Sequence, residues 1–96
     1  MTRSRTGWDV LQHEILEEQA ATISRLAEEL RDALDALTAV DSRAPHRARL
    51  VDTAASALFN FIVQRECSGF RWTEQVLEDY AVPAEVRARM GAVRPR

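Results

Sequence analysis

Four side chains near the start of the chain are of the types that bind metal ions: His13, Glu14, Glu17 and Glu18. His13 and Glu17 are one helical turn apart, so an imidazole and a carboxylate could share an ion if this segment is helical. A ferritin-like di-iron site needs Glu-x-x-His motifs on facing helices. No glutamate precedes a histidine by three residues here. We therefore interpret the acidic run as a solvated helix face and predict no metal site.

The single cysteine, Cys67, follows the polar triplet Gln64-Arg65-Glu66. We expect it at the C-terminal end of a helix, where the negative end of the helix dipole disfavours a thiolate. A packed thiol is therefore expected rather than a nucleophile. The sequence also has no Gly-rich phosphate loop and no Ser-His-Asp grouping. We predict no catalytic residue, no cofactor and no enzymatic activity.

The segment WTEQVLEDYAVPAEVRARMG is typical of two short helices joined by a tight turn, with Arg87 and Arg89 in the second. A helix-turn-helix must project its second helix to reach base edges. Here Val86 and Met90 need cover, and the formal net charge of the chain is −2. A DNA-binding regulator that uses residues 73–91 as a helix-turn-helix-like unit stays an alternative. A small-ligand or metal sensor in the bundle core is another.

The elements that must position these groups are helices. The first is predicted over residues 9–40 by leucine and isoleucine at seven-residue spacing, at Leu16, Ile23, Leu30 and Leu37. Thr6 or Asp9 could cap its start. Pro45 suits the first turn of a second helix that runs to Ser68, and Gly69 is a natural stop. Two short helices follow, over residues 73–80 and 83–91.

This order of elements predicts an all-α fold, with a long antiparallel helical hairpin followed by two short C-terminal helices. We expect residues 9–91 to form a single helical domain, with a disordered or frayed N-terminus at 1–8 and a C-terminal tail at 92–96. Because the link between the long helices is short, they should be antiparallel neighbours. A turn near residues 42–43 pairs positions whose numbers sum to about 85, which places Phe59 near Leu26.

Charged residues favour the same hairpin. Its second helix opens with Arg43, Arg47 and Arg49, which the pairing places opposite Asp32 and Asp35. Each exposed ion pair contributes about 0–1 kcal/mol, so these pairs would support the hairpin without driving it.

The second helix also carries five large apolar side chains that one neighbouring helix cannot cover: Leu58, Phe59, Phe61, Ile62 and Val63. Burying each of them contributes about 1.5–3 kcal/mol. The short helices have about two turns each and can cap only the end of a long helix. We therefore expect these five residues to form a core or dimer interface, and a homodimer to complete a four-helix core.

A polar cluster is expected near one end of the hairpin. Gln19 interrupts the apolar seam of the first helix, and the pairing places it beside Gln64, Arg65 and Glu66. A polar residue in a helical interface can fix register and oligomeric state. The alternative is that these four side chains are solvated at the rim of the bundle.

Composition limits the classes of partner. The chain has 96 residues, enough for one domain, and all 13 basic residues are arginine. The negative net charge gives no general attraction to nucleic acid or anionic lipid. We expect no signal peptide, because no apolar stretch follows the first arginines. The sequence has no apolar run of about 20 residues, and its single cysteine suits a reducing compartment. We expect a cytoplasmic protein without nucleic-acid or membrane partners.

Two segments, FIVQRECSGF and YAVPAEVRARMG, resemble parts of a small uncharacterised bacterial family of all-helical proteins of about a hundred residues, known as a domain of unknown function. The resemblance covers about residues 51–91 and implies no activity and no site residues. The function that we predict is a non-catalytic helical interaction or structural module that self-associates. An unidentified protein partner is a further option.

Overall fold

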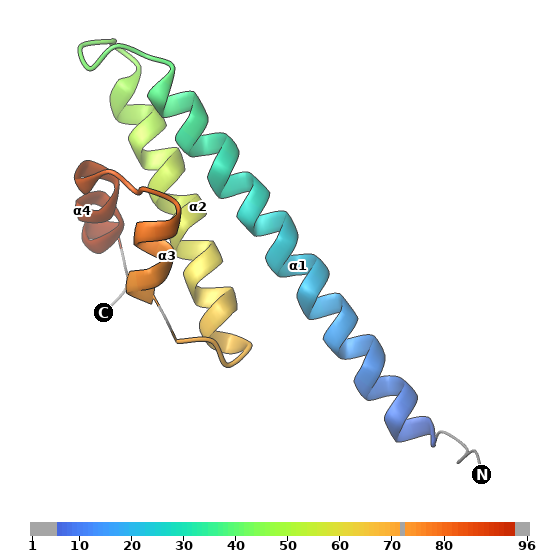
Figure 1. Ribbon diagram of the computed structural model, residues 1–96. Coiled ribbons are helices and arrows are strands. Elements are labelled where there is room, and N and C mark those ends of the chain that lie inside the picture. Colours follow the sequence, from blue (N-terminus) through green and yellow to red (C-terminus); the bar gives the residue numbers. More distant parts are fainter. Residues whose placement is uncertain (1–5, 72, 94–96) are drawn as a thin grey trace.

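The computed structural model describes residues 6–71 and 73–93, and these residues form four helices and no strand. The helices are α1 (Gly7–Thr38), α2 (Arg47–Cys67), α3 (Thr73–Asp79) and α4 (Ala84–Val93). α1 and α2 form an antiparallel hairpin, and α4 packs against α2 (Figure 1). The predicted all-α hairpin with two short C-terminal helices is confirmed.

The ends of the helical domain differ from the predicted boundaries. α1 begins at Gly7 because Thr6 and Asp9 form a capping box, in which the Asp9 amide donates to Thr6 Oγ1 at 3.0 Å. α4 continues through Gly91 to Val93. α1 therefore begins two residues before residue 9, and α4 ends two residues after residue 91, while the division of the chain into one domain with flexible ends stays a prediction. Residues 1–5 and 94–96 of the predicted flexible ends lie outside the described residues.

The core lies where the C-terminal half of α1, α2 and the two short helices meet. The Phe61 ring makes an edge-on contact with Tyr80, at 5.5 Å between ring centroids. The segment after α3 therefore covers part of α2. The buried apolar side chains are Leu26, Leu30, Leu34, Leu37, Val51, Ala54, Ala55, Leu58, Phe61, Ile62, Val76, Leu77, Val82 and Val86.

The grooves between the long helices agree with the predicted pairing to within about two helical turns. Glu29 and Ser56 line one groove between α1 and α2, and Gln19 and Arg65 line another. Both pairs of residue numbers sum to about 85, as the sequence indicates. The register was predictable because the apolar seams of the two helices match at one alignment.

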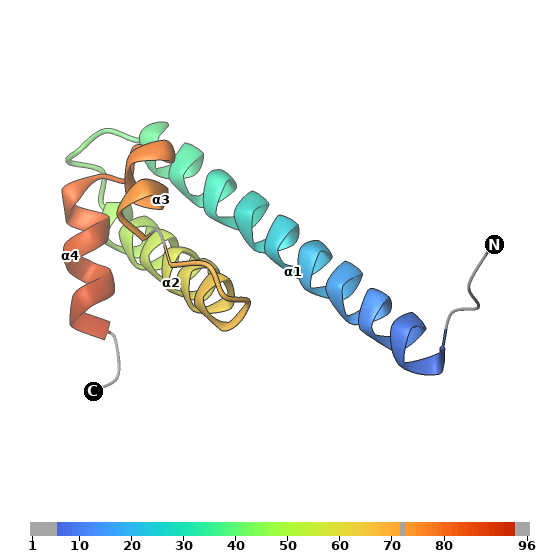
Figure 2. The same ribbon diagram turned by 60° about the horizontal axis from the view of Figure 1, so that its bottom comes forward.

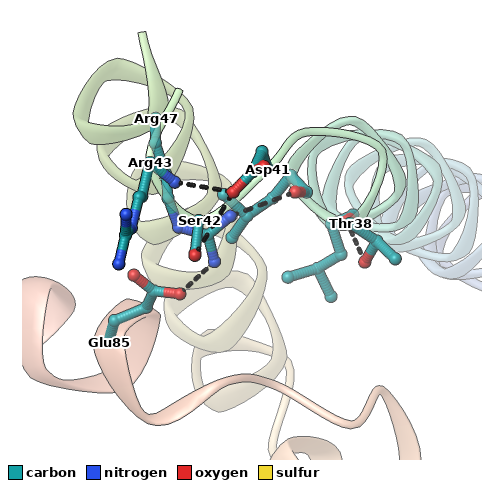
Figure 3. Close-up of polar contacts among 8 residues, drawn as sticks. Thr38, Asp41, Ser42, Arg43, Arg47 and Glu85 are labelled. Atoms are coloured by element: carbon teal, nitrogen blue, oxygen red, sulfur yellow. Dashed lines mark hydrogen bonds and ion pairs between the residues drawn. The ribbon is translucent and has the colours of Figure 1, made fainter. Parts of the chain in front are cut away.

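Polar contacts organise the hairpin turn (Figure 3). The Arg43 amide donates to Asp41 Oδ1 at 3.0 Å, which closes the turn. Arg47 Nη1 donates to the Leu37 carbonyl at the end of α1, at 3.5 Å. Its other terminal nitrogen forms an ion pair with Glu85 of α4. Arg47 thus joins α1, α2 and α4.

The predicted ion pairs between the arginines of the second helix and the aspartates of the first were wrong. Among the described residues, the inter-helix ion pairs join α2 to α4 and α3 to α4. α4 places Glu85 beside Arg47. The prediction considered only the two long helices and did not include α4 as a neighbour of α2.

The molecule is elongated, with principal extents of 65 × 29 × 20 Å. Its radius of gyration is 17.3 Å, whereas a compact domain of this length has about 12.5 Å. The N-terminal part of α1 causes the difference, because it extends well past the other helices (Figure 2). No helix in the described part of the chain is apolar over a length that could cross a bilayer.

Candidate functional site

The N-terminal part of α1 extends past the end of α2. α1 has 32 residues and α2 has 21, and Gln19 and Ala20 line the same groove as Arg65 in the last turn of α2. Residues 7–18, here called the arm, therefore lie beyond the reach of α2 (Figure 1). No residue of the arm is buried.

The arm exposes most of its large apolar side chains. Trp8 is 67% exposed, Leu11 48%, Ile15 45% and Leu16 60%. Trp8, Leu11 and Ile15 follow one another at spacings of three and four, so they share one face of the helix. Burial of each such side chain would contribute about 1.5–3 kcal/mol, so the arm is a surface that gains stability when it is covered.

The opposite face of the arm is charged. His13 Nε2 lies 3.4 Å from Glu17 Oε2, one helical turn away. The exposed Glu14 and Glu18 flank the apolar row, and Val10, which is 42% exposed, lies on the same side of the helix as His13 and Glu17. The arm is therefore amphipathic, with an apolar face that suits another helix and an acidic face that suits water.

A groove lies at the base of the arm, where α2 diverges from α1 in both views (Figures 1 and 2). Arg65 lies over the ring of Phe70 at 5.0 Å and over that of Phe61 at 5.6 Å. The hydroxyl of Ser68 is buried there without a hydrogen-bond partner. The groove is lined by Leu16, Gln19, Ala20, Ile23, Ser24, Arg65, Ser68 and Phe70.

The five apolar residues predicted as a core or dimer interface divide into two groups. Leu58, Phe61 and Ile62 are buried within one chain, so their burial needs no second copy. Phe59 is half-buried and Val63 is 37% exposed. The short helices cover more of α2 than their length suggested, because α4 packs along it while Tyr80 reaches Phe61.

The predicted polar cluster is only partly assembled. Gln19 and Arg65 line the same groove, Gln64 is half-buried and Glu66 is exposed. No hydrogen bond joins these four side chains, all of which lie in the described part of the chain. Arg65 instead contacts the two phenylalanine rings.

The residues considered for chemistry lie apart from one another. Cys67 is a free, exposed thiol, so the expectation of a packed thiol was wrong. Its position in the last turn of α2 faces solvent rather than the core. Within residues 6–71 and 73–93, no three His, Cys, Asp or Glu side chains lie close enough together to hold a metal ion.

The helix-turn-helix-like segment packs against the body of the protein. Val86 of α4 is fully buried. Arg87 lies 3.7 Å from Glu74 of α3, and Arg89 lies 2.5 Å from Asp52 of α2. The two arginines of α4 thus have carboxylate partners within the chain.

The apolar face of the arm was not among the predicted interfaces. Two signals could have revealed it. Trp8, Leu11 and Ile15 are spaced three and four residues apart, and the first predicted helix is longer than the second. Together they indicate an amphipathic segment with no partner opposite it.

Comparison with known proteins identifies the family of this chain, and that family has no known activity. A model of a family of unknown function, DUF6665, matches residues 1–96. No curated protein and no solved structure matches the chain. The resemblance seen over residues 51–91 thus extends to the whole sequence. The chain belongs to the family of unknown function DUF6665.

Proposed function

We propose that this protein is a non-catalytic helical module that self-associates as a homodimer, and that the apolar face of the arm is its interface. The observation that carries the proposal is the row of exposed Trp8, Leu11 and Ile15 on the arm, in which no described residue is buried. Such a row is typical of helix-to-helix docking surfaces.

The accessible surface of the chain supports this proposal. It measures 7161 Å², whereas a compact monomer of this mass exposes about 5,600 Å². The excess of about 1,600 Å² on each chain is larger than the roughly 800 Å² per partner that an interface of standard size buries. An interface on the arm replaces the expected interface on α2, whose Leu58, Phe61 and Ile62 are already enclosed.

Light scattering of purified variants tests the proposal. Ile15→Glu places a charge on the apolar face, and Ala21→Glu places the same charge on the exposed face that carries Glu14 and Glu17. We expect the wild type and Ala21→Glu to be dimers. Ile15→Glu should weaken association at least about a hundredfold, because each copy loses about 1.5 kcal/mol or more of burial.

A wild-type chain that is monomeric at high micromolar concentration would contradict the proposal. So would an Ile15→Glu variant that dimerises as well as Ala21→Glu. Circular dichroism of both variants should show wild-type helix content, because positions 15 and 21 are exposed.

We further place this module in the bacterial cytoplasm, since a single exposed thiol suits a reducing compartment and an all-arginine basic set fits a genome rich in G and C. The ion pairs of Arg87 and Arg89 lend no support to the DNA-binding alternative. Cell fractionation of the tagged full-length chain tests the location.

A further inference from the structure

The groove at the base of the arm has the form of a small-molecule site. Its volume is about 360 Å³, which is that of about twelve water molecules at about 30 Å³ each. Small-molecule sites begin at about 300 Å³ and combine apolar walls with a few polar groups that converge. Leu16 and Ile23 of α1, and Phe70, which follows α2, supply apolar walls here.

Three polar side chains of the groove, those of Gln19, Arg65 and Ser68, lack partners in the described part of the chain. No hydrogen bond or ion pair there involves the side chain of Gln19 or Arg65. Ser68 Oγ is buried and has no hydrogen-bond partner. Ser68 follows Arg65 by three residues at the end of α2, so the two lie about one helical turn apart. All three side chains can donate a hydrogen bond, so an acceptor placed among them would satisfy several donors at once.

Two aromatic rings restrain the guanidinium of Arg65. Its Cζ lies 5.0 Å from the centroid of the Phe70 ring and 5.6 Å from that of the Phe61 ring. Phe61 is buried, so the guanidinium rests partly on the core of the protein. A restrained guanidinium loses less freedom when it binds an anion, and its planar N–H groups match the two oxygens of a carboxylate.

Charge and polarity select the class of ligand. Arg65 is the one basic side chain among the described residues that line the groove, and none of those residues is acidic. A single positive charge balances one carboxylate, whereas a phosphate monoester carries up to about two negative charges. The apolar walls favour a ligand with a hydrocarbon tail over a bare anion. Such a tail removes apolar surface from water, including part of Leu16, which is 60% exposed.

We propose that this groove binds a small carboxylic acid with a hydrocarbon tail. The carboxylate accepts hydrogen bonds from Arg65 and Gln19, and from Ser68 once its hydroxyl turns toward the ligand. The tail lies against Leu16 and Ile23. All of these residues line the groove of a single chain and lie outside the apolar row of the arm, so the proposal does not depend on self-association.

Isothermal titration calorimetry of the full-length chain with octanoate tests the proposal. Arg65→Met removes the positive charge of the groove, and Arg49→Met removes a charge from an exposed position of the same helix outside the groove. Ala20→Phe fills the groove, and Ala21→Phe adds the same ring at an exposed position outside it. We expect octanoate to bind the wild type and both controls with a Kd in the millimolar range or tighter. Arg65→Met and Ala20→Phe should each raise the Kd at least about tenfold, because the first loses hydrogen bonds to a charged group and the second loses the free volume.

Titration with 1-octanol tests recognition of the carboxylate in the unchanged protein, because octanol has the same tail without the charge. It should bind at least about tenfold more weakly than octanoate. Equal binding of octanol and octanoate would overturn the proposal, as would the absence of any heat of binding at millimolar octanoate. An unchanged affinity in Arg65→Met or Ala20→Phe would overturn it as well. Circular dichroism verifies that the four variants are folded, and the comparison with octanol decides the matter if one of them is not.

Discussion

At the scale of single residues, Arg65 contacts two aromatic rings and does not form the hydrogen bonds that were predicted for it. We expected it to join a hydrogen-bonded cluster with Gln19. Its guanidinium instead lies over the rings of Phe61 and Phe70, at 5.6 and 5.0 Å. It is also the basic residue in the last turn of α2, where the helix dipole favours a positive charge.

Replacing Arg65 by methionine should therefore destabilise the fold by about 1 kcal/mol, because methionine keeps the apolar stem and loses the cation–π contacts. Arg49 of the same helix is exposed and supplies a matched control. Arg49→Met should change the free energy of unfolding by less than about 0.5 kcal/mol. Urea unfolding of both variants at one protein concentration measures the difference. Equal losses would show that the ring contacts of Arg65 are not stabilising.

At the scale of elements, glycine has opposite roles at two helix ends. Gly69 follows α2 with a φ of +95°, a conformation that side chains with a Cβ rarely adopt. Gly91 lies within α4, and a Cβ there would meet nothing within 4 Å. Replacing glycine by alanine should therefore change the free energy of unfolding in opposite directions at the two positions.

We expect Gly69→Ala to lower the free energy of unfolding by about 1–2 kcal/mol, the usual strain of a left-handed residue with a side chain. Gly91→Ala should raise it by up to about 1 kcal/mol through helix propensity. Thermal unfolding followed by circular dichroism compares the two with the wild type. If Gly91→Ala were the more destabilising change, α4 would not be the continuous helix seen here.

At the scale of the whole molecule, stability and association should be linked. The arm exposes apolar surface in one chain, so a dimer that covers it is favoured over unfolded chains by mass action. A tenfold rise in protein concentration should stabilise the wild type by about 1.4 kcal/mol per dimer.

The urea midpoint measured over two decades of concentration tests this link. It should rise with concentration for the wild type, and at each concentration it should be lower for Ile15→Glu, whose association is weaker. A constant wild-type midpoint would mean that folding and association are independent.

The sequence by itself determined the helices and their pairing. Seven-residue spacing of Leu16, Ile23, Leu30 and Leu37 specified α1, and the match of its seam with that of α2 specified the register, because both depend on local periodicity. Pro45 and Gly69 located the breaks to within a few residues.

Only the tertiary structure decided which apolar surface is left over. The periodicity of the sequence indicates that a helix face is apolar. It does not indicate which neighbouring element covers that face. The packing of α4 on α2 and the contact of Tyr80 with Phe61 enclosed side chains of α2 that were expected to need a second copy for their burial. The unequal lengths of α1 and α2 left Trp8, Leu11 and Ile15 exposed instead. Burial depends on contacts between segments distant in sequence, so it could be read only from the folded chain.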